Sequence, residues 1–273
     1  MSFSLRYGEQ GIWYGAFSLL ENDGLQQAVS TRFGGVSDKE YASLNLALHN
    51  GDAVEKVIEN RRRFAQGLGI DSTMLCTCEQ VHGTVVAKIG KSEAGAGSQR
   101  YETAIAATDA LITNEKNLPL FLFFADCTPI LFFDPEHKAI GLAHGGWKGT
   151  VGKIAQKTVL AMSREFGTRL DQCLVAIGPA IGPCCYEVDT YVKDQFVEAF
   201  PIAKEQIISP GKEPNKWMLD LSAANRIQLE EIGVQPKHID IAGVCTKCNS
   251  DVFFSYRADQ GKTGRIGALL CLK

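Results

Sequence analysis

The 273-residue chain has little net charge, no long apolar run and only five histidines. Its net charge of −3 gives no general attraction to nucleic acid or anionic lipid. No stretch approaches the ~20 uninterrupted apolar residues of a membrane span, and the amino terminus lacks the basic and apolar regions of a secretion signal. We therefore expect a cytoplasmic protein that binds neither nucleic acid nor membrane.

The chain also lacks a linker rich in proline, glycine or serine, an internal repeat and a low-complexity segment. With 45% hydrophobic residues, it is long enough to bury a full core. Its nine cysteines are odd in number and scattered through strand-like runs, which fits reduced thiols better than a disulfide framework. These features predict a single domain over residues 1–273.

Apolar runs and turn residues predict strands that alternate with helices. Residues 120–133 are almost all apolar, and the internal Pro129 argues against a helix, so we expect two buried strands joined by a tight bend. A strand over residues 139–143 leads to His144, and Thr150 can cap the next helix. Other segments predict strands at residues 174–177, 239–244 and 266–272 and helices after Asp189 and near residues 220–232. The pattern indicates an α/β protein with helices packed on a mixed sheet.

One basic run stands out. Arg61, Arg62 and Arg63 fall within a helix expected to begin after Asp52, and a solvated helix face is a more common setting for such a run than a nucleic-acid site. We therefore expect these three side chains to face water.

Three residues, His82, Cys127 and His144, each lie where an apolar run meets a tight polar turn. Three such ligands from separate strand ends suit zinc and leave a fourth position for water or substrate. A thiol within an apolar run is more often a small buried hydrophobe, and a lone histidine is more often a core residue. Asp126, which is costly to bury without a partner, favours the metal hypothesis without deciding it.

Two weaker signals accompany this triad. The turn at Gly145-Gly146 opens a helix whose amino-terminal amides, with Lys148, could bind an anion such as phosphate, although a plain turn with an exposed lysine is equally consistent. The pair Cys245 and Cys248 resembles half of a structural zinc site, but the spacing of Cys184-Cys185 does not fit the other half. We therefore do not expect a four-cysteine zinc site.

Seven segments together resemble the YfiH-type family, also called laccase-domain or multicopper polyphenol oxidase proteins and related to peptidoglycan editing factors. The resemblance covers nearly the whole chain. The segments are residues 30–37 (STRFGGVS), 43–46 (SLNL), 80–83 (QVHG), 125–127 (ADC), 143–147 (AHGGW), 253–257 (FFSYR) and 264–265 (GR).

The resemblance implies a single domain with a layered α-β-β-α arrangement and one metal, usually zinc, on His82, Cys127 and His144. It further implies purine nucleoside phosphorylase activity, which converts adenosine, inosine or methylthioadenosine and phosphate into base and ribose 1-phosphate, together with adenosine deaminase activity. The chain departs from the commonest family pattern at Gly145, where alanine is frequent, and at Lys148, where arginine is frequent. Lysine supplies charge but not bidentate phosphate binding.

Within this hypothesis, Arg32, Lys148 and Arg257 are expected around phosphate, and Asn45 is expected to contact substrate. Asp126 could shuttle a proton during deamination, which would use water activated by the metal. Residues next to each other on a strand point to opposite faces, so Asp126 could also face away from Cys127.

Other functions remain open at this stage. A multicopper oxidase needs many histidines, commonly in His-x-His pairs, and this chain has five histidines and no such pair. Copper could still displace zinc and give a secondary oxidase activity. Cys127 could instead be a nucleophile, activated by His82 or His144, of an amide hydrolase that edits peptidoglycan precursors. A metal-binding partner protein without turnover is a third possibility, and the sequence leaves open a monomer or a homodimer.

Overall fold

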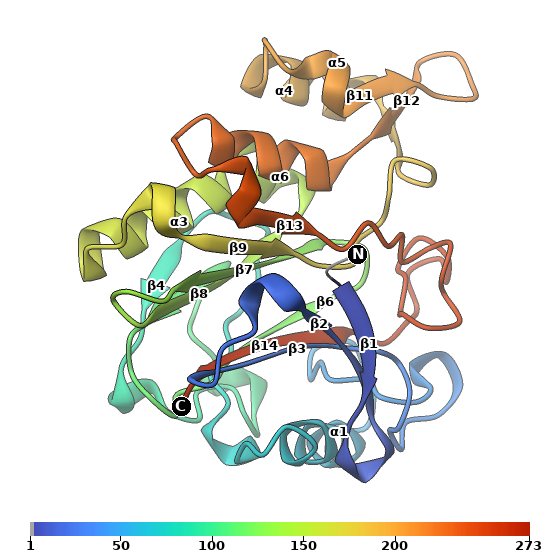
Figure 1. Ribbon diagram of the computed structural model, residues 1–273. Coiled ribbons are helices and arrows are strands. Elements are labelled where there is room, and N and C mark those ends of the chain that lie inside the picture. Colours follow the sequence, from blue (N-terminus) through green and yellow to red (C-terminus); the bar gives the residue numbers. More distant parts are fainter. Residues whose placement is uncertain (1–2) are drawn as a thin grey trace.

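Two β-sheets face each other in the computed structural model, which describes residues 3–273 (Figure 1). The first sheet has the strand order β1-β2-β3-β14-β6, with bounds β1 Phe3–Tyr7, β2 Trp13–Phe17, β3 Leu25–Ser30, β14 Ile266–Leu272 and β6 Leu120–Phe124. The second has the order β13-β9-β7-β8-β5-β4, with bounds β13 Ile239–Ile241, β9 Leu174–Ile177, β7 Thr128–Asp134, β8 Ala139–Gly145, β5 Ala110–Thr113 and β4 Val86–Lys88.

Helices cover the outer faces of both sheets. The helices of the chain are α1 Val54–Gln66, α2 Trp147–Val151, α3 Ile154–Phe166, α4 Thr190–Ala199, α5 Lys204–Ile207 and α6 Leu221–Glu230, of which α4 and α5 lie beyond α6. Phe64 of α1 packs on the first sheet, whereas Met162 of α3 and Leu229 of α6 pack on the second. Within residues 3–273, none of these helices is long and apolar enough to cross a membrane.

The main core lies between the sheets. Leu122 and Leu270 of the first sheet belong to the same buried cluster as Leu131 and Leu142 of the second. Each central strand is buried on both faces, because one face meets the opposite sheet and the other meets a helix. The predicted mixed α/β fold with four α-β-β-α layers is confirmed.

The bend at residues 125–127 connects the two sheets. As predicted, residues 120–133 form two buried strands, but β6 pairs with β14 while β7 pairs with β8 and β9. The chain therefore crosses from one sheet to the other at this bend. Asp126 takes a positive φ of 80°, which is uncommon for a residue other than glycine.

The segment after His144 differs from the prediction. The helix α2 begins at Trp147, so Thr150 lies inside it rather than capping a longer helix, and α3 begins after Lys153, which has a φ of 65°. The Thr150 hydroxyl accepts a hydrogen bond from Nδ2 of Asn225 at 3.0 Å. The side chain of Thr150, which the sequence predicted as a helix cap, is instead buried against α6.

A smaller sheet lies beyond α6 (Figure 1). It has the order β10-β12-β11, with bounds β10 Glu187–Asp189, β12 Lys216–Leu219 and β11 Ile208–Pro210. Phe196 of α4, Ile207 of α5 and Leu219 of β12 share a buried cluster with Leu221 and Ala224 of α6. Asp189 and Asp220 cap α4 and α6 through the amides of Val192 and Ala223. The predicted starts of these two helices are confirmed.

Candidate metal site

His82, Cys127 and His144 meet at one end of the second sheet. Cys127 lies immediately before β7, His144 lies in β8, and the pairing of these strands places Pro129 opposite His144. The three possible ligand atoms lie within 4.8 Å of one another, and Nε2 of His82 is 3.8 Å from Sγ of Cys127. The structure therefore brings together the three residues that the sequence proposed as a triad.

Asp109, just before β5, orients both histidines. Its carboxylate accepts hydrogen bonds from the backbone amides of His82 at 2.9 Å and Gly83 at 2.6 Å. The same carboxylate lies 2.9 Å from Nδ1 of His144. Because that contact engages Nδ1, Nε2 of His144 is the nitrogen available to a metal, as in carboxylate-histidine-metal sites.

Tight packing holds the triad in place. His82 has a positive φ of 60°, and its loop is held in that conformation by the amide contacts to Asp109. A Cβ added to Gly146 would lie 2.7 Å from Cδ2 of His82 and 3.3 Å from Sγ of Cys127. The glycine at this position therefore allows the two ligands to approach each other.

The charges of the triad favour a thiolate. Burial would raise the pKa of Cys127, but interactions with His144 and His82 lower it to about 6. Burial would lower the pKa of His144, but the Cys127 thiolate and the Asp109 carboxylate raise it to about 9. A thiolate is the form of cysteine that binds a metal.

The donor set fits a metal ion. One thiolate and two imidazoles suit zinc, and three protein ligands leave one position open. His144 is almost fully buried whereas His82 is exposed, so the site opens to solvent on the His82 side. The arrangement supports metal binding, while copper and zinc are both compatible with these ligands.

In metal-depleted protein, Cys127 should react with iodoacetamide at neutral pH. The rate should rise with pH through a pKa of about 6, since only the thiolate is nucleophilic. Peptide-resolved mass spectrometry between about pH 5 and 9 measures this, with the other cysteine peptides as internal references. A midpoint near the ~8.5 of an ordinary thiol would contradict the electrostatic assignment.

A pocket of about 550 Å³ contains the triad. His49, Arg257 and Arg265 also line it. Burial, together with the charge of Arg265, lowers the pKa of His49 to about 4, so this imidazole is neutral at physiological pH.

The two arginines of the pocket lack acidic partners among the residues that the structure describes. Among residues 3–273, no carboxylate forms an ion pair with Arg257 or Arg265. Nη1 of Arg257 donates to the carbonyl of Glu187, and Nη1 of Arg265 donates to the carbonyls of Thr263 and Gly264. The remaining N–H groups of the two arginines, which have no acidic partner within residues 3–273, can give the pocket an anion-binding wall.

Asp126 also lines the pocket, but its side chain has protein partners. Oδ1 accepts from the Thr246 hydroxyl at 2.6 Å, and Oδ2 accepts from the Arg257 amide at 2.6 Å. These bonds fix the bend between the sheets to the loops that follow β13. They also reduce the capacity of Asp126 to exchange a proton with a ligand.

Three other predicted residues lie outside the pocket lining. The Arg32 guanidinium donates to the carbonyl oxygens of Ala42 at 2.9 Å and Ser250 at 2.6 Å. Asn45 is fully buried and accepts a hydrogen bond from the backbone amide of Arg265 at 2.9 Å. Lys148 is exposed, with its ammonium 5.6 Å from the ring of Trp147. Of the four predicted substrate contacts, only Arg257 reaches the pocket wall.

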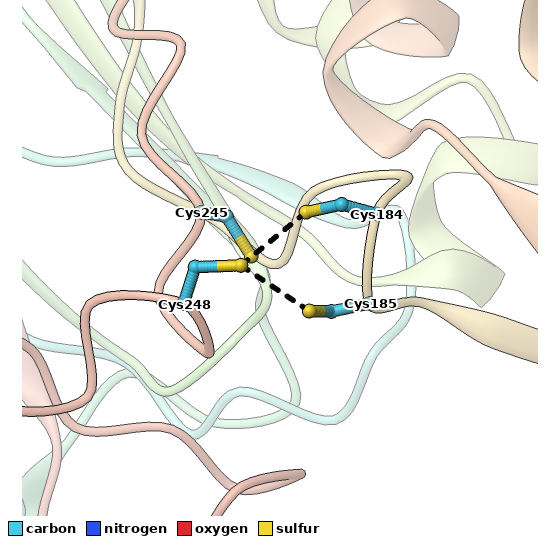
Figure 2. A group of neighbouring side chains, drawn as sticks. All are labelled: Cys184, Cys185, Cys245 and Cys248. Atoms are coloured by element: carbon cyan, nitrogen blue, oxygen red, sulfur yellow. Dashed lines mark hydrogen bonds between the residues drawn. The ribbon is translucent and has the colours of Figure 1, made fainter.

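The four cysteines that the sequence treated as unrelated pairs form a second cluster. Cys184 and Cys185 lie beside Cys245 and Cys248, and their sulfur atoms all lie within 4.8 Å of one another (Figure 2). The prediction that Cys245 and Cys248 lack a second pair of cysteines is wrong. Cys184 and Cys185 provide that pair from a tight turn rather than from a Cys-x-x-Cys repeat.

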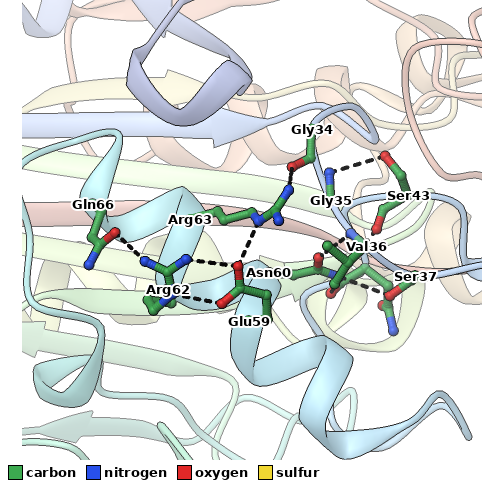
Figure 3. A network of polar contacts seen from close by, with 11 residues as sticks. Gly34, Gly35, Val36, Ser37, Ser43, Glu59, Asn60, Arg62, Arg63 and Gln66 are labelled. Carbon is green, nitrogen blue, oxygen red and sulfur yellow. Dashed lines mark hydrogen bonds and ion pairs between the residues drawn. The ribbon is translucent and has the colours of Figure 1, made fainter.

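The three arginines of α1 do not share a solvated face. Arg62 and Arg63 pair with Glu59, and Arg63 also contacts the carbonyl of Gly34 (Figure 3). Arg61 is only 1% exposed, so its prediction as a surface residue is wrong. The helix turns Arg61 toward the interior, where backbone carbonyls supply acceptors.

The sequence did not assign Asp109, which contacts the triad, or His49 and Arg265, which line the pocket. An acidic residue directly before the apolar run 110–112 was a usable signal for Asp109, because a buried carboxylate needs partners. The sequence pointed to Arg265 only through the Gly264-Arg265 segment of the family resemblance. No local pattern placed His49 beside this pocket, since it belongs to a distant segment.

Comparisons with known proteins find relatives over most of the chain. "Purine nucleoside phosphorylase YlmD" of Geobacillus stearothermophilus is 44% identical over 250 residues, which cover 90% of each chain. The Bacillus subtilis protein of the same name is 37% identical over 244 residues, covering 89% of this chain and 87% of the relative.

Solved structures of similar proteins have the same fold. The Bacillus licheniformis hypothetical protein YfiH has a TM-score of 0.92 and 34% identity, covering 98% of this chain and 99% of that one. YlmD from Geobacillus stearothermophilus has a TM-score of 0.92 and 39% identity over 100% of this chain and 99% of that one. A family model described as multi-copper polyphenol oxidoreductase laccase matches residues 26–273. The chain therefore belongs to this laccase-like family, which is the YfiH-type family.

Proposed function

We propose that this protein is a zinc-dependent purine nucleoside phosphorylase. The observation that carries the proposal is one pocket that joins a candidate three-ligand metal site to Arg257 and Arg265, which have no acidic partner in the described part of the chain. The pocket volume of about 550 Å³ falls within the range for small-molecule sites. The names of the relatives from Geobacillus stearothermophilus and Bacillus subtilis point to the same reaction.

In this reaction a phosphate oxygen forms a bond to the anomeric carbon of ribose as the bond to the base nitrogen breaks. The base leaves and takes up a proton. Arg257 and Arg265 bind and orient the phosphate, which converts an encounter between two ligands into a reaction within one pocket. The neutral His49 can form a hydrogen bond with the nucleoside without adding positive charge to the pocket.

His82, Cys127 and His144 would hold the zinc ion. When bound, zinc would supply Lewis acidity to a substrate oxygen or nitrogen. Asp109 keeps Nε2 of His144 directed at the site, and Gly146 leaves room for the ligands.

Adenosine deamination and methylthioadenosine phosphorolysis are finer parts of this proposal. Deamination needs a group that carries a proton between water and the purine. Asp126 lies in the pocket wall, but both of its oxygens accept hydrogen bonds from Thr246 and Arg257. The geometry therefore supports phosphorolysis better than deamination.

Product analysis tests the proposal. Adenosine, inosine and methylthioadenosine are incubated with the purified protein, with and without phosphate, and the products are identified by mass spectrometry. We expect free base and ribose 1-phosphate only when phosphate is present, loss of both after chelation, and recovery with zinc. Free base and ribose without phosphate would instead indicate hydrolysis, and inosine from adenosine would add deamination.

Replacing Arg265 with alanine should raise the phosphate KM about 10- to 100-fold, because a hydrogen bond to a charged group contributes about 1.5–3 kcal/mol. Steady-state kinetics at varied phosphate measures this. Arg164→Ala is the matched control, since Arg164 is exposed and pairs with Glu165. The same measurement on Arg32→Ala compares the two assignments. A larger KM increase for Arg32→Ala than for Arg265→Ala would contradict the phosphate site proposed here.

One observation favours a second candidate, an amide hydrolase with Cys127 as the nucleophile. Cys127, His144 and Asp109 are arranged as a thiol, a base and a carboxylate that orients the base. A metal-bound thiolate should resist alkylation until a chelator is added, whereas a free catalytic thiolate should react at once. Immediate alkylation of fully metallated protein, with turnover of peptidoglycan precursors, would favour the hydrolase.

A further inference from the structure

Four cysteines lie together outside the nucleoside pocket. We propose that Cys184, Cys185, Cys245 and Cys248 bind a second zinc ion, which has a structural role. Figure 2 shows the four side chains converging from two loops.

The two loops are held side by side by the second sheet. They follow β9 and β13, which pair in parallel, so both leave the same edge of the sheet. Backbone hydrogen bonds continue beyond the strands, from Ala180 N to Val244 O at 3.3 Å and from Thr246 N to Ala180 O at 3.0 Å. The cysteines therefore lie on segments whose separation is fixed by backbone pairing.

A tight turn makes the neighbouring cysteines usable as a pair. The amides of Cys185 and Tyr186 both donate to the carbonyl of Gly182, at 2.9 and 3.0 Å. In a turn, unlike in a strand, adjacent side chains can point to the same side. This geometry removes the objection that the sequence spacing raised.

The distances suit a shared ion. Sγ of Cys248 lies 3.5 Å from Sγ of Cys184 and 3.4 Å from Sγ of Cys185. Four thiolates at a zinc–sulfur distance of ~2.3 Å in a tetrahedron are about 3.8 Å apart. A disulfide would require a sulfur–sulfur distance of about 2.05 Å.

Backbone amides also favour a thiolate at Cys245. The amide of Gly182 lies 3.2 Å from Sγ of Cys245, and the amide of Cys248 donates to the same sulfur. Such N–H···S bonds are the outer contacts that stabilise a metal-bound thiolate. A Cβ on Gly182 would lie 3.1 Å from Cβ of Cys245 and 3.3 Å from Sγ of Cys184, so a larger residue would crowd the cluster.

Four protein ligands leave no open position, which makes the ion structural rather than catalytic. It would tie the loop after β9 to the loop after β13 at the pocket wall. Thr246, between two of the cysteines, donates to Asp126, and the amide of Ile181 donates to the Asp126 carbonyl at 3.0 Å. Ile181 and Tyr186 line the pocket themselves. The second ion thus fixes one wall of the pocket.

Metal analysis of the purified protein tests this site independently of any enzymatic activity. We expect two zinc ions per chain in the wild type and one in Cys127→Ala. Cys248→Ser should also lose one ion, and Cys184→Ser serves as a second variant if Cys248→Ser does not fold. Cys271→Ala, which changes a cysteine on the distant strand β14, should keep both ions.

A measurement on the wild type avoids the folding question. Cys184 and Cys248 are exposed, so as free thiols they should be alkylated rapidly. We expect all four cysteines to resist iodoacetamide until a strong chelator is added, and then to react together. One zinc ion per wild-type chain with unchanged content in Cys248→Ser, immediate alkylation of Cys184 and Cys248, iron in place of zinc, or a disulfide within the cluster would each overturn the proposal.

Discussion

Replacing Asp109 with asparagine should weaken metal binding at the triad by about 10- to 100-fold and reduce turnover to a similar extent. Asp109 is fully buried, and its carboxylate accepts from the amides of His82 and Gly83 and contacts Nδ1 of His144. In asparagine, an NH2 group replaces one of the carboxylate oxygens. At least one of these N–H groups would then face another donor instead of an acceptor. The substitution therefore disturbs two of the proposed metal ligands, although Asp109 itself is not one of them.

The measurement is a competition titration with a chromophoric chelator, followed by kinetics at saturating zinc. Asp134→Asn is a matched control, because Asp134 is also buried, accepts from the amides of Glu136 and His137, and contacts Nδ1 of His137. Asp134 is the last residue of β7, whereas Cys127 lies just before the first residue of that strand. Equal losses of metal affinity in both variants would mean that Asp109 acts only through overall stability.

Replacing Arg61 with methionine should lower the free energy of unfolding by about 3 kcal/mol and the Tm by roughly 6 °C or more. The guanidinium donates to the carbonyls of Leu46, Gly97 and Ser98, at 2.7–2.8 Å, and lies 4.6 Å from the ring centroid of Phe123. Methionine fills much of the volume but leaves three buried carbonyls without this donor. Unsatisfied buried acceptors cost about 1–3 kcal/mol each, partly offset by no longer burying a charge.

Denaturant unfolding measures the stability difference, and hydrogen exchange at residues 97–98 reports whether that loop is released. Arg62→Met is the control on the same helix, because Arg62 is partly exposed and pairs with Glu59. An exposed ion pair contributes about 0–1 kcal/mol, so this variant should unfold almost as the wild type does. A similar loss of unfolding free energy in both variants would show that the buried contacts of Arg61 stabilise the protein no more than the exposed ion pair of Arg62 does.

Much of the fold could be predicted from local patterns. Strands at residues 174–177 and 266–272, and helices beginning after Asp189 and Asp220, are confirmed. These elements combine clear apolar runs with side chains that cap them. The strand predicted at residues 239–244 ends earlier, at Ile241. The amphipathic helix predicted after Thr150 is present as α3, but its predicted start at a Thr150 cap was wrong, because Thr150 is buried against Asn225 inside α2.

The proposed metal triad was also accessible from the sequence. Each ligand lies where an apolar strand pattern meets a polar turn, and such junctions gather at the edge of a sheet. The position of Arg32 could not be predicted in this way, because the fold places its guanidinium on backbone carbonyls outside the pocket lining. Charge alone does not reveal which acceptors surround a side chain.

By itself, the sequence determined the α/β class, the strand segments around the site and the three candidate ligands, since these depend on short-range periodicity and turn chemistry. Only the tertiary structure decided that Asp109 joins both histidines, that Arg265 faces the pocket and that Cys184 and Cys185 meet Cys245 and Cys248. The physical reason is that strand order and pairing bring together residues far apart in the chain. Local patterns carry no information about that order.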